Sequence, residues 1–293
     1  MQRHTDHNKA AEGMTTKQKW VMASTASGFS LENMDIMFLS FALTPIISQL
    51  HLTGAQAGWI GSITNLGMLV GGACFGLMGD RIGRVKTFTY TIFIFAIATG
   101  LMYFAHSLPV IYALRFLAGI GAGGEYGVGI ALIAENFQTH MVGRMTSVAA
   151  IGGQVGAIIA ALMAALIIPR WGWNTLFLIG IVPVILTYFI RRHLTESESF
   201  VKAHKRAEKN HERINFGRLF ATPHLALQTV GLMWMTIVQI AGYFGLMNWL
   251  PSIVQKQQGL SVSGSSLWMV ATLIGMSIGM MVFGTIMDNF GPR

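Results

Sequence analysis

The chain has 293 residues, of which 53% are hydrophobic and only 11% are charged, and this balance excludes an ordinary soluble domain. Its net charge of +8 could suggest a nucleic-acid partner, so the positions of the cations have to decide that point. The single cysteine, Cys74, lies in an apolar stretch, so no intrachain disulfide, cysteine-based metal site or cofactor is expected. We predict an all-α, polytopic membrane protein.

Eight stretches are apolar over the roughly 20 residues that a membrane-spanning helix needs. They cover residues 20–48, 56–79, 86–106, 109–134, 143–168, 173–191, 224–254 and 264–287. The first stretch contains two acidic residues, so it reads as a membrane helix rather than a signal peptide. We expect four parts: a cytoplasmic tail (1–19), a six-helix bundle (20–191), a polar cytoplasmic linker (192–220) and a second bundle (221–293), which the family resemblance described below implies is incomplete.

The cations lie almost entirely on one side of this predicted topology. Of the 20 lysines and arginines, 17 fall in the tail, the linker, the chain end and the loops of the same parity. Loops rich in Lys and Arg stay in the cytoplasm, so the N-terminus and the linker are predicted to be cytoplasmic, in the plasma (inner) membrane. The bias also explains the basic charge without nucleic acid.

Four charged residues lie inside predicted spans, where each costs about 2.5–3.5 kcal/mol unless it has a partner or faces water. Glu32 and Asp35 share a face of the first helix, and Arg115 and Glu125 lie in the fourth. Two interpretations stay open: a proton-binding group that faces a cavity, or a static ion pair that only orients the first and fourth helices.

Between the second and third predicted helices lies a short, charged, glycine-rich loop. Its glycines suit a tight reversal, Asp80 can accept hydrogen bonds from the first turn of the next helix, and the cations hold the loop in the cytoplasm. The residues concerned are Gly76, Asp80, Arg81, Gly83 and Arg84. Gly284, Asp288 and Gly291 repeat the Gly76, Asp80 and Gly83 spacing 208 positions later, so the chain contains an internal repeat.

Several helices carry small residues at every fourth position, as helices that pack closely in lipid do. These stripes are Gly72 and Gly76; Gly119, Gly123 and Gly127; Gly152, Gly156, Ala160 and Ala164; and Gly275 and Gly279.

The loop around Asp80 and its repeat around Asp288 resemble the cytoplasmic loop signature of the major facilitator superfamily of secondary transporters. The stretch from Arg115 to Tyr126 resembles that family's fourth-helix signature, and Glu32-Asn33-Met34-Asp35 resembles the first-helix acidic motif of proton symporters for organic acids, with glutamate for the usual first aspartate. Trp171-Gly172-Trp173-Asn174 and Leu194-Thr195-Glu196-Ser197 are similar to sugar-porter motifs, with Asn174 for an expected arginine and Thr195 for an expected proline.

The resemblance implies two six-helix bundles, so further helices are expected beyond Arg293. It implies a non-enzymatic symporter that imports a small organic solute, an organic or aromatic acid being favoured, with Asp35, Glu32, Arg115 and Glu125 coupling the proton. The loop around Asp80 would serve gating.

The seventh helix lines the substrate cavity in this family, so its polar residues Gln239, Tyr243 and Asn248 are candidate substrate contacts; they could equally bond neighbouring helices. The expected partners are the solute, protons and the lipid bilayer, and the protein is expected to be monomeric.

Two alternatives to an importing symporter remain. One is an efflux antiporter, although Gly152-Gly153-Gln154-Val155-Gly156-Ala157 lacks the proline typical of that class. The other is a membrane sensor that transports nothing.

Overall fold

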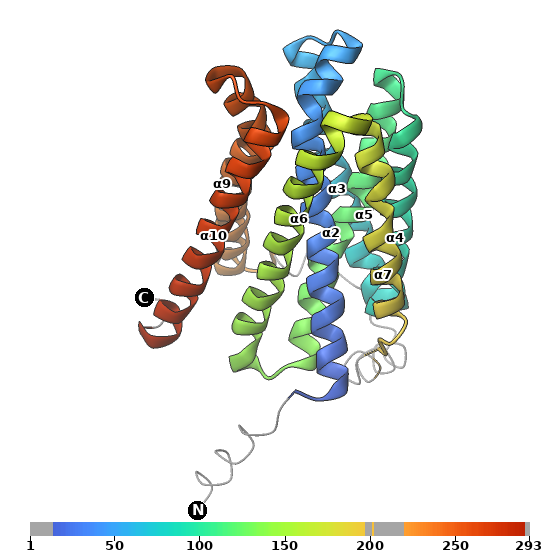
Figure 1. Cartoon of the computed structure of the whole chain (residues 1–293). Coiled ribbons are helices and arrows are strands. Elements are labelled where there is room, and N and C mark those ends of the chain that lie inside the picture. Colours follow the sequence, from blue (N-terminus) through green and yellow to red (C-terminus); the bar gives the residue numbers. More distant parts are fainter. Residues whose placement is uncertain (1–13, 197–200, 202–219, 291–293) are drawn as a thin grey trace, which may run out of the picture.

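A computed structural model describes residues 14–196, 201 and 220–290. The expected tail and linker lie largely outside these residues, as do Gly291, Pro292 and Arg293 of the repeated loop motif. The described part is helical, which confirms the predicted fold class (Figure 1). Its helices are α2 (Thr16–Leu50), α3 (Gly54–Ile82), α4 (Arg84–Leu101) with the short η1 (Met102–Phe104), α5 (Leu108–Asn136), α6 (Thr139–Ile179), α7 (Ile181–Arg191), α9 (Pro223–Gln258) and α10 (Val262–Phe290).

Seven described helical segments are long and apolar enough to cross a membrane, one fewer than the eight that the sequence predicts. The difference arises at the predicted fifth and sixth helices. The helix α6 covers 143–168 and continues to Ile179, with Pro169 inside it and a non-helical residue at Gly172 (φ 80°, ψ 167°). The range of α6 therefore joins two helices across the kink at Gly172: the predicted fifth helix ends before this residue, and the predicted 173–191 helix begins after it and continues through α7.

The first helices begin and end where their side chains satisfy the terminal backbone groups. Thr15 and Gln18 form a reciprocal capping box at the start of α2, and Thr53 and Gln56 form another at the start of α3. Between them, α2 ends at His51, which adopts the left-handed conformation (φ 49°). A three-residue connection is therefore enough to reverse the chain.

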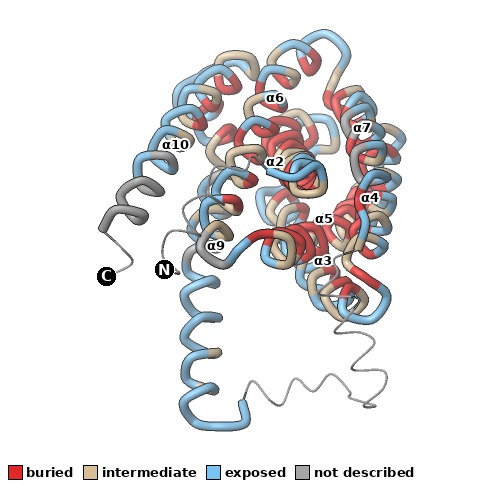
Figure 2. Tube along the Cα trace, turned by 90° about the horizontal axis from the view of Figure 1, so that it is seen from below, coloured by how far each residue is buried: buried red, intermediate tan, exposed pale blue. Residues whose placement is uncertain are grey.

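The core is formed by helices of the first bundle, with α2 at its centre (Figure 2). The closest approach is between α3 and α5. A Cβ added at Gly71 would collide with the backbone of Ile120, and one at Gly119 with the backbone oxygen of Thr64. Such contacts with a neighbouring backbone are possible only where the residue at the contact has no side chain.

The predicted stripes are only partly interfaces. Gly119 and Gly123 of α5 face α3, and Gly152 and Gly156 of α6 face α2 at Ala26 and Ser30. Four glycines of the stripes have open surroundings within 4 Å, so no described helix packs against them: Gly76, Gly127, Gly275 and Gly279. On α3 the close contacts are made by Gly67 and Gly71 instead.

The last two helices lie along one side of the bundle, next to α6 and α2 (Figures 1 and 2). Ser252 of α9 hydrogen-bonds Thr44 of α2 at 3.1 Å, and Ser263 of α10 donates to the Ala165 carbonyl of α6 at 2.8 Å. The first half of α9 is exposed, with none of its apolar window from Pro223 to Tyr243 buried. Contact with the bundle is thus made by the second half of α9.

Candidate functional site

A buried ion pair connects the first and fourth membrane helices of the bundle. Arg115 of α5 donates to both carboxylate oxygens of Asp35 of α2, with Nη1–Oδ1 and Nη2–Oδ2 distances of 3.0 and 2.5 Å. The Arg115 side chain is 0% exposed and that of Asp35 is 5% exposed. This bidentate geometry gives a fixed orientation as well as charge compensation.

Two threonines complete the coordination of this pair. Thr99 of α4 donates to Asp35 Oδ1 at 3.3 Å, and Arg115 Nε donates to the Thr64 hydroxyl of α3 at 3.3 Å. The pair therefore holds α2, α3, α4 and α5 at one level of the bundle. A buried charge needs such partners, because an uncompensated one is costly in a medium of low dielectric constant.

A second group of polar side chains lies beside the pair. Glu32 is 7% exposed and Glu125 is 1% exposed, and Glu32 lies close enough to both Glu125 and Asp35 to interact electrostatically with them. The structure thus brings together the four residues expected to couple the proton. Three carboxylates and one guanidinium share this region, so like charges repel unless a carboxylate binds a proton or a cation approaches.

Two polar residues from other helices join this acidic group. Tyr243 of α9 interacts with Gln154 of α6 and with Glu32. The Gln154 side chain is 5% exposed, and its Oε1 atom has no hydrogen-bond partner among the described residues. The group therefore reaches across α2, α5, α6 and α9, and includes an amide oxygen that is available to accept a hydrogen bond.

The three candidate substrate residues of the seventh membrane helix differ in what the structure describes. Tyr243 is half-buried and packs against the main core. Gln239 and Asn248 lie in α9, but their side chains are outside the described part of the structure. Gln154 was not predicted as a site residue, although a glutamine between small residues in an apolar helix was a readable signal.

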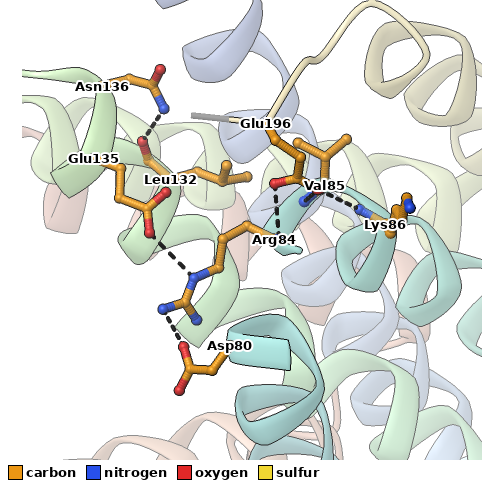
Figure 3. Close-up of polar contacts among 8 residues, drawn as sticks. All are labelled: Asp80, Arg84, Val85, Lys86, Leu132, Glu135, Asn136 and Glu196. Atoms are coloured by element: carbon orange, nitrogen blue, oxygen red, sulfur yellow. Dashed lines mark hydrogen bonds and ion pairs between the residues drawn. The ribbon is translucent and has the colours of Figure 1, made fainter. Parts of the chain in front are cut away.

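The glycine-rich loop joins α3 to α4, and Arg84 is the centre of its ion pairs (Figure 3). Arg84 Nη2 lies 2.5 Å from Asp80 Oδ1, and Arg84 Nε lies 3.3 Å from Glu135 Oε1 near the end of α5. Arg84 therefore connects Asp80 to Glu135 of α5. Glu135 was missed in the sequence, since a charge near a helix end usually faces solvent.

The hydrogen-bond acceptor for the first turn of α4 is Glu196, not Asp80 as predicted. Its carboxylate accepts from the backbone N–H groups of Arg84, Val85 and Lys86 at 3.0, 3.0 and 3.3 Å (Figure 3). A carboxylate at a helix N-terminus satisfies free donors and complements the helix dipole. The Asp80 carboxylate instead pairs with the Arg84 side chain.

The same segment also connects to α2 and constrains the loop backbone. Lys17 Nζ donates to the Glu196 carbonyl at 3.1 Å. Gly83 has φ 112° and ψ 150°, and a Cβ there would overlap the Glu196 carboxylate. Only glycine suits both conditions. Of the other predicted loop residues, Gly76 has open surroundings within the described residues, and Arg81 is exposed.

Comparison with known proteins places these features in context. A family model described as Major Facilitator Superfamily matches residues 25–293. A putative metabolite transport protein of Haemophilus influenzae is 36% identical over 276 residues, which cover 93% of this chain and 68% of that protein.

Two further relatives come from Acinetobacter baylyi. A niacin transporter is 29% identical over 91% of this chain and 66% of its own length. A cis,cis-muconate transport protein is also 29% identical, over 90% of this chain and 64% of its own length. The chain therefore spans about two thirds of the length of these relatives.

A crystal structure of a D-xylose–proton symporter has a similar fold, with a TM-score of 0.74 over 94% of this chain and 70% of that one. The two sequences are 16% identical, so the likeness concerns the fold.

Proposed function

This chain belongs to the major facilitator superfamily, and on that premise we propose that it is a secondary active transporter that imports a small organic solute together with a proton. The observation that carries the proposal is the buried Asp35–Arg115 pair with Glu32 beside it. A carboxylate that changes partner when it is protonated can couple proton movement to a rearrangement of the helices around it.

An organic or aromatic acid is the favoured solute class. The names of the relatives from Acinetobacter baylyi, a niacin transporter and a cis,cis-muconate transport protein, support this choice. The local charge also bears on it, because an organic anion would approach a region with more carboxylates than cations. Protonation of one carboxylate before the anion binds would remove part of that repulsion. Such a site would therefore favour binding of a proton together with the anion.

The Arg84 network supports a gating role for the glycine-rich loop. It connects the end of α3, the start of α4 and the end of α5, while Glu196 connects the segment after α7. All of these lie at the end of the bundle where α2 begins, which we propose is the cytoplasmic end (Figure 1). Breaking these contacts would let that end open without changing the core.

The test is uptake of labelled solutes into proteoliposomes with an imposed inward proton gradient. A panel of aromatic acids, sugars and monocarboxylates is compared, and we expect accumulation of an organic acid that an uncoupler abolishes. An efflux antiporter would instead accumulate solute when the gradient is reversed. A sensor would show no exchange of labelled for unlabelled solute under any gradient.

A further inference from the structure

A groove of about 280 Å³ opens between α4 and α7, at the end of the bundle where α2 begins. Two cations, Lys86 and Arg192, and two tyrosines, Tyr90 and Tyr188, line it, and Leu194 is among its apolar residues. It is distinct from the site around Asp35. Lys86 is 13 residues before Thr99, the α4 residue that contacts Asp35, which is about 20 Å along a helix.

The two cations of the groove can bind an anion, whereas the neighbouring cations Arg84 and Lys17 are already engaged by other groups. The Arg84 side chain is held by Asp80 and Glu135, and the Lys17 ammonium by the Glu196 carbonyl. Lys86 and Arg192 are exposed, and in the described part of the chain neither side chain forms an ion pair. The Glu196 carboxylate close by accepts three backbone hydrogen bonds and, among the described contacts, forms no ion pair with either cation.

The helices that form the groove each present a continuous apolar face to the outside. On α4 the exposed residues are Tyr90, Phe93, Ile97 and Leu101, and on α7 they are Val182, Ile185 and Phe189. The spacing of three or four residues puts each set on one side of its helix. Lys86 continues the first row and Arg192 the second, so both apolar faces end in a cation at the same level.

An apolar face that ends in cations and tyrosines at the membrane boundary has the chemistry of a phospholipid site. We propose that the groove binds the headgroup phosphate of an anionic phospholipid such as phosphatidylglycerol, with its acyl chains lying along α4 and α7. The phosphate contacts Lys86 and Arg192, and Tyr90 and Tyr188 line the same groove. The lipid would thus bind directly beside the Glu196 cap at the start of α4.

The proposal is tested with the purified 293-residue chain, delipidated in detergent and titrated with lipid under native mass spectrometry. We expect phosphatidylglycerol to be retained in preference to phosphatidylcholine with the same acyl chains. Lys86→Gln/Arg192→Gln should lower the apparent affinity for phosphatidylglycerol by about 30-fold, since each cation near the membrane surface contributes about fivefold. The matched control is Arg144→Gln, an exposed cation on α6 outside the groove, which should bind as the wild type does.

Each other result would overturn the proposal. Equal retention of both lipids would show that the headgroup is not recognised, and an unchanged affinity in the double variant would place the lipid elsewhere. Displacement of the lipid by millimolar inorganic phosphate would make the groove a site for free anions. Thermal unfolding of the double variant should match that of the wild type because both side chains are exposed. The assay requires neither transport nor a known orientation, so its outcome is independent of the proposed function.

Discussion

At the scale of single residues, Asp35 and Arg115 depend on each other because both side chains are almost completely buried. Their side chains are 5% and 0% exposed, and two hydrogen bonds join the guanidinium to the two carboxylate oxygens. Removing one partner of such a pair typically costs about 3–5 kcal/mol, because the remaining charge is buried without compensation. A substitution at this site therefore changes stability as well as chemistry.

Asp35→Asn is predicted to abolish accumulation driven by a proton gradient while leaving exchange of labelled for unlabelled solute, since exchange requires no proton release. The variant should also unfold at lower temperature, with a loss of about 3 kcal/mol, because the amide oxygen can accept only part of the Arg115 hydrogen bonds. Transport in proteoliposomes and thermal unfolding measure the two effects.

Two further variants separate coupling from stability. Asp35→Asn/Arg115→Gln should regain part of the lost stability without regaining coupling, which a double-mutant cycle quantifies.

Glu32→Gln removes a carboxylate that lies near two others, so it should leave stability unchanged or raised, and reduce coupling less than Asp35→Asn. If Asp35→Asn accumulates solute as well as the wild type, the proton carrier has to be sought at Glu125.

Asp80→Asn is predicted to slow transport strongly while membrane insertion and stability stay near wild type. The Asp80 side chain is 41% exposed, and exposed ion pairs contribute at most about 1 kcal/mol to stability. The effect would instead come from releasing Arg84 at the end of the bundle that we propose opens. Initial uptake rates at equal protein content measure it, and wild-type rates would reduce the loop to an ordinary basic turn.

At the scale of elements, the start of α4 is defined by a residue more than 100 positions later in the chain. Gly83 lets the backbone turn, and the Glu196 carboxylate then satisfies the first N–H groups of the helix. Charge-assisted hydrogen bonds of this kind are about twice as strong as neutral ones. The segment after α7 is therefore part of the structure of α4.

Glu196→Gln is predicted to weaken the start of α4 specifically. The amide removes the negative charge and leaves one acceptor oxygen, so stability should fall by about 1 kcal/mol. Hydrogen exchange at the backbone amides of Arg84, Val85 and Lys86 should accelerate. Asp80→Asn is the matched control and should leave these amides protected. Faster exchange in Asp80→Asn, with unchanged exchange in Glu196→Gln, would identify Asp80 as the cap of α4.

Gly119→Ala is predicted to destabilise the α3–α5 contact, because the new methyl group would collide with the Thr64 backbone oxygen. Overpacking of this kind costs about 1–3 kcal/mol. Gly127→Ala adds the same atom to the same helix, where nothing described lies within 4 Å, and should be neutral. Thermal unfolding of the pair in one detergent gives the comparison; equal melting temperatures would contradict the close packing.

At the scale of the whole molecule, the distribution of cations and the arrangement of helices point to the same orientation. The Arg84 network and the groove cations Lys86 and Arg192 lie at the end where α2 begins (Figure 1). Positive residues are retained on the cytoplasmic side during insertion. The N-terminus and the linker are accordingly predicted to be cytoplasmic.

A topology reporter fused near Arg206 tests this orientation. An enzyme that is active only in the cytoplasm should work at that position, and one that folds only in the periplasm should not. The same pair of reporters fused after Arg170, in a predicted outer loop, should give the opposite result. Activity of the periplasmic reporter near Arg206 would invert the topology and move the lipid groove to the other leaflet.

The sequence by itself determined the helical membrane fold, the family and the buried charges, because each depends on composition or on short local spacing. A run of about 20 apolar residues can satisfy its backbone in lipid only as a helix, and an isolated charge in such a run needs a partner. That partner was among the residues predicted, since Arg115 and Asp35 were two of the four charges expected inside the spans.

Only the tertiary structure decided which residues meet. Periodicity marks Gly119 and Gly127 alike as small residues on one helix, yet only Gly119 faces α3, since the neighbour is set by packing of the whole bundle. Local sequence likewise favoured Asp80 as the cap of α4. Glu196 lies 112 residues after Arg84, and it reaches the start of α4 because α7 packs beside α4. No local sequence pattern encodes that contact.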